Sequence, residues 1–271
     1  MNQLFLNETF KQLWQGKDIF QEAFSIKGES IRKVKSRHTF YWTLQGKGYF
    51  IKLHVGCGWR EIFKNLFQLK YPVLGAAQEY KAIRHLERIK VNTMTICAFA
   101  SKGITPANIT SFLITEELTN TISLEDFCHN WNTNPPSYEL KYKIIKALGT
   151  MIGEMHRSGL NHRDCYLCHF LLDKNTLENP KLYVIDLHRA QIRKKVPKRY
   201  IMKDLAGIFF SAMDANLSKR DIFHFIQAYT QQPISITLKE NASYYKKIYN
   251  IARKLYKKIH KKDWNNTIFS E

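Results

Sequence analysis

Acidic side chains are scarce in this chain of 271 residues: 23 Asp and Glu stand against 42 Lys and Arg, which gives a formal net charge of +19. A field of this sign attracts polyanions, namely nucleic acid, an anionic membrane or an acidic glycolipid. The aromatic residues do not interleave with basic ones in any recognised nucleic-acid motif, so we expect no specific nucleic-acid binding. The charge therefore favours an anionic membrane or an acidic glycolipid as partner.

A long apolar run is missing as well. No stretch of 18 apolar residues occurs, so we expect no membrane-spanning helix. Residues 1–20 lack a basic segment that leads into an apolar stretch, so no secretory signal is expected. The five cysteines, without a signal for export, favour a reducing cytosol. These absences predict a cytoplasmic protein, and its length is sufficient for well-packed cores.

The most informative segment is residues 161–172, with the sequence NHRDCYLCHFLL. His162-Arg163-Asp164 has the form of a kinase catalytic loop, and Asp186 follows 22 residues after Asp164. In phosphoryl transfer the first Asp orients the attacking hydroxyl and accepts its proton, and the second holds Mg²⁺ against the nucleotide phosphates. The tripeptide alone is often a surface turn, so its context has to decide.

The context favours a kinase. Residues 143–158 place their apolar side chains on one helical face, and Gly159 follows as a left-handed cap. Residues 170–172 and 182–185 read as two short strands joined by a polar turn. Helix, catalytic loop, hairpin and metal-binding Asp is the order that the larger lobe of a kinase needs.

The same segment contains a competing motif. Cys165, Cys168 and His169 match C-x-x-C-H, the attachment signal of c-type haem, and His162 lies close enough in sequence to suggest zinc. Haem attachment requires export, and no second ligand pair of zinc spacing occurs elsewhere. We expect these cysteines to be small buried apolar residues instead.

A kinase also needs a strand Lys for the phosphates and a helix Glu that pairs with it. Lys52 lies between apolar neighbours in a strand-like run, and Glu79 begins a helical pattern. An ordinary Glu favoured by the helix dipole is the alternative for Glu79. No G-x-G-x-x-G is present; the basic segment 27–37 takes its place between two strand-like stretches, with no role assigned to individual residues.

The connection between the lobes is expected at residues 111–118, an apolar strand that ends in polar residues. The backbone of Glu116 and Leu118 would face the adenine edge. Ser123 is a suitable N-cap for a following helix. Residues 130–136 read as a surface loop.

The chain resembles the lipopolysaccharide core heptose kinase family of the protein-kinase-like superfamily. The resemblance covers roughly residues 28–212 and rests on five segments: 48–54, 58–70 with 72–76, 161–172, 185–190 and 203–207. It implies an α+β, protein-kinase-like fold of two lobes. The small, mainly antiparallel β lobe with one key helix, residues 1–118, would bind nucleotide. The larger, mainly α lobe, residues 119–271, would carry the catalytic loop.

The resemblance also implies a function and a set of site residues. The reaction would be the ATP- and Mg²⁺-dependent phosphorylation of a heptose, most simply heptose I, in the nascent heptose-Kdo-lipid A acceptor. It would take place at the cytoplasmic face of a Gram-negative inner membrane. The implied roles are a catalytic base at Asp164 within the loop of His162 and Arg163, a Mg²⁺ ligand at Asp186, and nucleotide contacts at Lys52, Glu79, Glu116, Leu118 and His169.

This sequence departs from the protein-kinase pattern at two of these positions. His169 stands where protein kinases have a metal-binding Asn, and neutral imidazole is a poor Mg²⁺ ligand. His169 therefore contacts phosphate, or the second metal is held differently; the sequence leaves both open. His188 stands in place of the Gly of D-F-G. Asp204 resembles the Asp that supports the catalytic loop, with a helix N-terminal acid as the alternative.

The spacing after Asp186 argues against a protein substrate. Asp204 follows only 18 residues later, without an A-P-E-like segment, so there is little room for a peptide platform. A short basic bridge fits a small or phosphorylated acceptor better; it contains Arg189, Arg193, Lys194, Lys195, Lys198 and Arg199. A kinase acting on Kdo, another small molecule or a protein is the alternative, and a basic pseudokinase is a further one. We also suspect that residues 58–76 help to form the acceptor site.

The C-terminal segment 244–262 reads as a basic amphipathic helix. Its apolar stripe contains Ile248, Ile251, Ala252, Leu255 and Ile259, and lysines and arginines fill the rest. Such a helix can lie on an anionic bilayer, or pack by its stripe with the lysines in water. Its basic faces could also dock a small acidic protein such as an acyl carrier protein.

Overall fold

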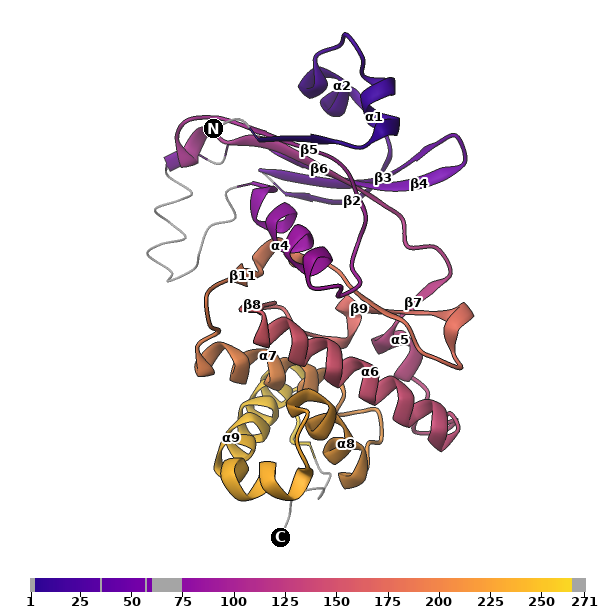
Figure 1. Ribbon diagram of the computed structural model, residues 1–271, viewed down its shortest axis with the longest axis vertical. Coiled ribbons are helices and arrows are strands. Elements are labelled where there is room, and N and C mark those ends of the chain that lie inside the picture. The colour runs from indigo at the N-terminus through magenta and orange to yellow at the C-terminus, as the bar shows by residue number, and fades with distance from the viewer. Residues whose placement is uncertain (1–2, 35, 57, 60–74, 265–271) are drawn as a thin grey trace. The chain divides into compact units, whose positions relative to one another are not determined.

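The structure is a computed structural model that describes residues 3–34, 36–56, 58–59 and 75–264 (Figure 1). It divides into two compact units. Unit 1 contains residues 1–85, 94–119 and 187–189, and unit 2 contains residues 86–93, 120–186 and 190–271. The predicted assignment of nucleotide binding to residues 1–118 and catalysis to residues 119–271 stays a prediction.

Unit 1 is built on a six-stranded antiparallel sheet with the order β1-β5-β6-β4-β3-β2. Its strands are β1 (Gln3–Leu6), β2 (Glu29–Val34), β3 (Arg37–Leu44), β4 (Lys47–His54), β5 (Ile96–Lys102) and β6 (Thr110–Glu116). Along β4 the buried Tyr49, Ile51 and Leu53 alternate with Lys52. Because side chains of a strand alternate between faces, Lys52 and His54 share the face opposite these three.

Helices cover both faces of this sheet (Figure 1). On one face lie α1 (Glu8–Leu13) and α2 (Ile19–Ser25), capped by Asn7 and Asp18. They supply Phe10 and other apolar side chains to a core shared with β4 and β6. On the other face lies α4 (Ala77–Arg88), whose Tyr80 stacks on Phe99 of β5 at 4.0 Å between ring centroids. Sequence reasoning did not anticipate β1, α1 or α2.

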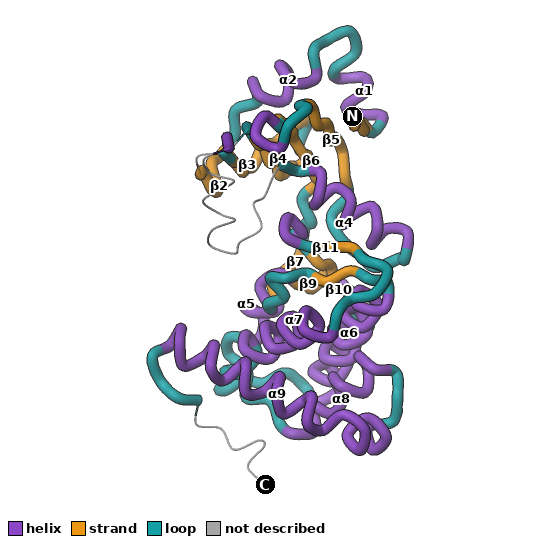
Figure 2. Tube along the Cα trace, turned by 90° about the vertical axis from the view of Figure 1, so that its left-hand side faces the viewer, coloured by secondary structure: helices purple, strands orange, loops and turns teal. Residues whose placement is uncertain are grey.

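Unit 2 is mainly helical (Figure 2). It also contains two small sheets of order β10-β9-β7 and β11-β8. Its helices are α5 (Leu124–Cys128), α6 (Tyr138–Arg157), α7 (Lys198–Ser211), α8 (Lys219–Thr230) and α9 (Ile234–His260). Its strands are β7 (Thr121–Ser123), β8 (Leu160–Asn161), β9 (Phe170–Asp173), β10 (Leu182–Val184) and β11 (Gln191–Ile192). Four 3-10 helices occur among the described residues of the chain: η1 (Pro106–Asn108), η2 (Leu167–His169), η3 (Lys174–Thr176) and η4 (Leu187–Arg189).

The elements around the catalytic segment confirm most of the sequence predictions. The helix predicted at 143–158 is α6, which begins five residues earlier after the N-cap Ser137. The predicted hairpin is β9 with β10. Ser123 caps α5 by accepting from the backbone N–H of Asp126 at 3.0 Å. Local periodicity and capping were therefore sufficient to find these elements.

The prediction for residues 27–37 is wrong, and the one for residues 130–136 is correct except at Trp131. Residues 27–37 do not connect two strands: they contain β2, an edge strand whose side chains are all exposed. Because β2 buries neither face, its sequence has no alternation of apolar and polar residues, and a strand could not be predicted there. Residues 130–136 are not merely a surface loop, since Trp131 is buried against Cys128 and Ala215.

The stripe predicted for the C-terminal helix is only partly correct. In α9 the buried residues of this region are Ile248, Ala252 and Tyr256, whereas Ile251 and Ile259 are exposed. The helix packs mainly on α7. No helix in the described part of the chain is long and apolar enough to cross a bilayer.

Gly159 determines how the chain enters the catalytic segment. It has φ = +91°, and a Cβ there would collide with the backbone carbonyl oxygen of Arg193. We expect Gly159→Ala to destabilise the protein by about 3 kcal/mol, because left-handed strain and overpacking add. Gly46, at φ = +78° with open space around it, is the matched control, and Gly46→Ala should cost about 1 kcal/mol. Urea unfolding measures the loss of stability in both variants. Equal losses would contradict the collision expected at Gly159.

Candidate active site

Lys52 and Glu79 form an ion pair within unit 1. Glu79 lies in the first turn of α4, and its Oε1 is 2.6 Å from Nζ of Lys52. The Glu79 side chain is almost fully buried, and its Oε2 has no hydrogen-bond partner among the described residues. A buried carboxylate with a free oxygen costs free energy unless it serves another purpose. The pairing expected from the sequence is present, and its role towards a nucleotide stays a prediction.

His54 is a buried basic group that sequence reasoning missed as a site residue. It shares the sheet face of Lys52, and its cross-strand partners are Arg37 on β3 and Ser111 on β6. Burial lowers the pKa of His54 to about 3, and the charges of Arg37, Lys52 and His188 add to the effect. His54 is therefore neutral, and its Nε2 has no partner among the described residues.

The catalytic loop in unit 2 is held by the carboxylate of Asp204. Oδ2 of Asp204 accepts from the backbone N–H of His162 at 2.7 Å, and Oδ1 accepts from that of Arg163 at 3.0 Å. Nε2 of His156 lies 3.3 Å from the same Oδ2. Asp204 is buried in α7, so these donors compensate a charge that water does not reach. The supporting role suggested by the sequence is confirmed.

The loop is strained where Asp204 holds it. Arg163 has φ = +74°, in the left-handed region that side chains with a Cβ avoid. Such strain persists only where surrounding contacts over-determine the backbone. The two hydrogen bonds to Asp204 supply this constraint, and they fix the residue that precedes Asp164.

His162 connects the catalytic loop with the strand that leads to Asp186. Its ring is fully buried, and burial lowers its pKa, so the ring is neutral. Nε2 donates to the carbonyl oxygen of Ile185 at 2.9 Å. The ring stacks on His169, with centroids 5.5 Å apart and planes 6° from parallel. This geometry suits a positioning residue, and direct catalytic roles for His162 and Arg163 stay predictions.

The ring of His169 contacts both the backbone of Asp164 and the carboxylate of Asp186. Nδ1 of His169 donates to the backbone carbonyl oxygen of Asp164 at 2.7 Å, which leaves Nε2 facing Asp186. Nε2 lies 3.6 Å from Oδ2 of Asp186. Asp186 has φ = +57°, a second left-handed residue in this small region. The structure thus brings Asp164, His169 and Asp186 together, as the sequence led us to expect.

The metal-binding capacity of this pair is limited. Within the described ranges no group of three or more His, Cys, Asp or Glu side chains could hold a metal ion. Mg²⁺ at nucleotide sites usually takes one or two protein carboxylates and completes its shell with phosphate oxygens and water. The carboxylate of Asp186 fits that requirement, with His169 beside it.

The cysteines of the C-x-x-C-H motif are thiols at neutral pH. Burial raises the pKa of Cys168 to about 11, and it raises the pKa of the fully buried Cys165 well above its usual value. Haem attachment and zinc binding both proceed through thiolates. Cys165 is therefore a small buried side chain as expected, whereas Cys168 is only half-buried.

The strand end proposed to face adenine is the end of β6. The backbone N–H of Glu116 donates to Thr95 at 3.0 Å, and that of Glu117 donates to Gly48 at 2.9 Å. The adenine contacts of Glu116 and Leu118 stay predictions. Residues 60–74, most of the segment suspected of forming the acceptor site, lie outside the described residues.

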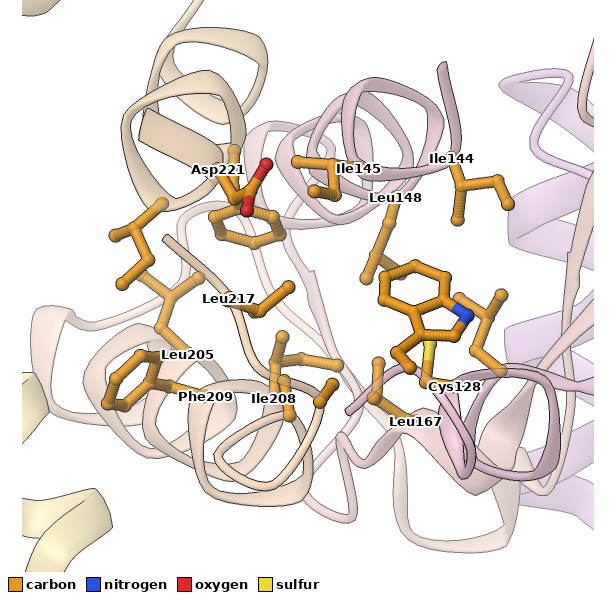
Figure 3. Close-up of a pocket in the computed structure, with 16 residues that line it drawn as sticks. Cys128, Ile144, Ile145, Leu148, Leu167, Leu205, Ile208, Phe209, Leu217 and Asp221 are labelled. Carbon is orange, nitrogen blue, oxygen red and sulfur yellow. The ribbon is translucent and has the colours of Figure 1, made fainter. Parts of the chain in front are cut away.

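An apolar cavity lies within unit 2, and Leu167 and Leu205 are among its lining residues (Figure 3). Its volume is about 80 Å³, and α5, α6, α7 and α8 contribute to its wall. The lining is apolar apart from Asp221, which pairs with Lys141 at 2.8 Å. Such a wall suits an apolar chain rather than a nucleotide or a sugar.

Comparison with known proteins places this geometry in a family. Residues 21–229 match the lipopolysaccharide kinase (Kdo/WaaP) family. Lipopolysaccharide core heptose(I) kinase WaaP of Escherichia coli is 48% identical over 238 residues, which cover 87% of this chain and 90% of the relative. The protein of the same name from Pseudomonas aeruginosa PAO1 is 44% identical over 94% of this chain and 96% of its own length. The chain belongs to the Kdo/WaaP family.

A solved structure supports this membership at the level of the fold. WaaP in complex with acyl carrier protein superposes with a TM-score of 0.83 at 40% identity. The match covers 94% of this chain and 99% of the other. The fold is therefore the mixed α+β, protein-kinase-like fold that the sequence predicted.

In this Kdo/WaaP family member, His54 should make stability depend on pH. Its pKa is near 3 when folded, against 6.5 normally, so between these values the unfolded chain binds the extra proton. The free energy of unfolding should then fall as the pH drops below about 6.5, and His54 should contribute about 1.4 kcal/mol per pH unit to this fall. Between about pH 6.5 and 5, the free energy of unfolding of His54→Gln should therefore fall by about 2 kcal/mol less than that of the unmodified protein.

Urea unfolding at several pH values measures this difference. The matched control is His129→Gln, which makes the same chemical change at an exposed position of unit 2. Parallel stability profiles for the unmodified protein and His54→Gln would contradict the assignment.

Proposed function

We propose that this protein is an ATP- and Mg²⁺-dependent kinase that phosphorylates heptose I of the lipopolysaccharide inner core. The observation that carries the proposal is its identity of 44–48%, over most of its length, with relatives named lipopolysaccharide core heptose(I) kinase. The juxtaposition of Asp164, His169 and Asp186 supports it, because phosphoryl transfer needs a base beside a metal-binding carboxylate.

In this proposal Asp164 is the catalytic base. It orients a hydroxyl of the acceptor and accepts its proton as the oxygen forms a bond to the γ-phosphorus of ATP. The bond between that phosphorus and the bridging oxygen breaks, and ADP leaves with the electron pair. The hydrogen bonds of Asp204 to the loop hold this base in place before the reaction, so little reorganisation is needed.

The nucleotide contacts in this proposal are those expected from the sequence. Lys52, oriented by Glu79, binds phosphate oxygens, and Glu116 and Leu118 present backbone to the adenine. Asp186 would hold Mg²⁺, with His169 next to it. When bound, the ion neutralises negative charge that develops on the phosphates. This division of tasks is the same as that expected from the sequence.

An acceptor other than heptose is the second candidate. The family description includes Kdo, and a kinase acting on that sugar would use the same residues. A protein acceptor is less well supported, because β11 and α7 follow Asp186 closely and leave no long activation segment. A pseudokinase is disfavoured by the ion pair of Lys52 and by the presence of both catalytic carboxylates.

The function is tested by mass spectrometry of acceptors incubated with the protein and MgATP. An unphosphorylated inner-core lipopolysaccharide with heptose should gain one phosphate, and an acceptor that ends at Kdo should gain none. A gain on the Kdo-only acceptor would move the reaction to that sugar. Failure on both acceptors, with ATP still bound, would overturn the proposal.

Asp164→Asn should lower transfer at least about 100-fold while MgATP binding stays close to normal, because the proton acceptor is lost and the metal site remains. Asp186→Ala should instead weaken Mg²⁺-dependent ATP binding. Turnover and calorimetric ATP titration separate the two effects. Asp263→Asn, at an exposed position, is the control for a lost carboxylate. Equal turnover by Asp164→Asn and the unmodified protein would refute the base assignment.

The basic surface of α9 is proposed to bind anionic partners. Its exposed cations include Lys246, Lys247, Arg253, Lys254, Lys257 and Lys258, followed by Lys261 and Lys262. An anionic inner membrane is one partner, which would place the enzyme on the cytoplasmic face. An acyl carrier protein is a second, supported by the WaaP complex and by an apolar cavity of suitable chemistry for an acyl chain.

Replacing Lys257, Lys258, Lys261 and Lys262 by Glu should weaken binding to anionic vesicles at least about tenfold, since each basic residue near such a surface contributes about 1 kcal/mol. Flotation at rising salt measures this, with uncharged vesicles as control. Titration of acyl carrier protein forms a second arm. Unchanged vesicle binding would make α9 a structural helix only, and absence of carrier binding by the unmodified protein would exclude that partner.

A further inference from the structure

Arg193 is held rigidly, and by neutral groups. Its guanidinium donates to Oδ1 of Asn161 at 2.6 Å and to Oε1 of Gln191. Its Cζ lies 4.7 Å from the ring centroid of Tyr200, and its backbone N–H donates to Gly159 at 2.9 Å. In the described part of the chain no carboxylate forms an ion pair with it. An oriented guanidinium without a counter-charge is prepared for an anion from outside.

The support of Arg193 costs free energy. Asn161 is completely buried, and its side-chain Nδ2 has no hydrogen-bond partner in the described ranges. Its Oδ1 is used for Arg193, so the amide cannot be turned to satisfy Nδ2 without losing that bond. A buried donor left unpaired lowers the stability of the folded state. A local cost of this kind is typical of a residue retained for binding or catalysis.

A second arginine stands at the same ring. Cζ of Arg199 also lies 4.7 Å from the centroid of Tyr200, and its guanidinium donates to the Tyr200 hydroxyl at 3.0 Å. Arg199 lies in the first turn of α7, which has no acidic residue and no side-chain cap from Pro197. Positive charge is unfavourable at a helix N-terminus unless an anion compensates it. Tyr200 thus organises two guanidinium groups that lack a negative partner in the described structure.

The two arginines lie near the proposed reaction centre, within the same unit. Asn161, which binds Arg193, directly precedes the catalytic loop, and β8 pairs with β11 beside it. Three residues of extended chain span at most about 11 Å, so Asn161 and Asp164 are no further apart than that. Neighbouring sugar units of one acceptor can bridge such a distance.

We propose that Arg193 and Arg199 form an anion clamp that binds a carboxylate or phosphate group of the acceptor next to the sugar that is phosphorylated. The clamp rests on the proposed function and adds a specificity determinant to it. It selects acidic sugar chains, because a neutral one leaves both guanidinium groups without a counter-charge. Forked donors match the two oxygens of a carboxylate or phosphate, which a lysine does not.

The test compares steady-state kinetics of Arg193→Gln and Arg199→Gln on three acceptors: the intact heptose-containing inner core, a carboxyl-reduced form and a dephosphorylated form. On the intact acceptor each variant should raise KM about 10–100-fold, while kcat and the KM for ATP stay within about twofold. The form that lacks the recognised anion should be a poor substrate of the unmodified enzyme and should show no further loss in the variants. A merely structural role would not produce this dependence on the acceptor.

Arg220→Gln is the matched control. Arg220 occupies the second position of α8, and its Cζ lies 5.3 Å from the ring of Tyr138, so the variant removes an equivalent guanidinium elsewhere. Arg193→Lys keeps the charge and should recover part of the affinity, and far-ultraviolet circular dichroism verifies folding. If Arg193→Gln does not fold, Arg199→Gln still tests the clamp, because Arg199 is exposed and its replacement should not unfold the protein. Equal KM values on all three acceptors would overturn the clamp, whereas no transfer to any of them would overturn the proposed function.

Discussion

The conformation of residues 161–164 depends on one buried carboxylate, that of Asp204. It accepts hydrogen bonds from the backbone of His162 and Arg163 and lies beside His156, so three donors from two segments compensate a charge removed from water. Without this compensation the charge would be too costly to bury, and with it the strained backbone at Arg163 is held. The position of Asp164 follows from that constraint, and so does the stack of His162 on His169 that leads to Asp186.

The two units differ in how their positively charged side chains are compensated. In unit 1, Glu79 neutralises Lys52, while neighbouring His54 stays neutral because burial and the nearby charges of Arg37 and Lys52 oppose its protonation. In unit 2, Arg193 and Arg199 are held by amide groups and by Tyr200, without a carboxylate in the described structure. A kinase whose nucleotide and acceptor are both anionic gains from such sites, since each ligand supplies the missing charge on binding.

Much of the candidate site could be predicted from local sequence. Asp164 and Asp186 were found because a helix, a loop and a hairpin surround them in a fixed order. The pairing of Lys52 with Glu79 rested on a strand and a helix that each have a clear period. Other features could not be read in this way. The segment 27–37 is an exposed edge strand without alternation, and α1 and α2 gain their stability from a sheet built by later residues. The stripe of α9 was misjudged at Ile251 and Ile259, because which face α7 covers is a matter of packing.

The sequence by itself determined the elements around residues 161–172 and the surplus of positive charge, and it singled out Asp164 and Asp186 as candidate carboxylates, because these depend on local periodicity, spacing and composition. Only the tertiary structure decided which charges are compensated. Asn161 with Arg193, Tyr200 with two arginines, and His54 with Arg37 and Ser111 come together through strand pairing and helix packing between distant segments. Burial and hydrogen bonding are properties of these assembled neighbours, and no single stretch of the chain contains them.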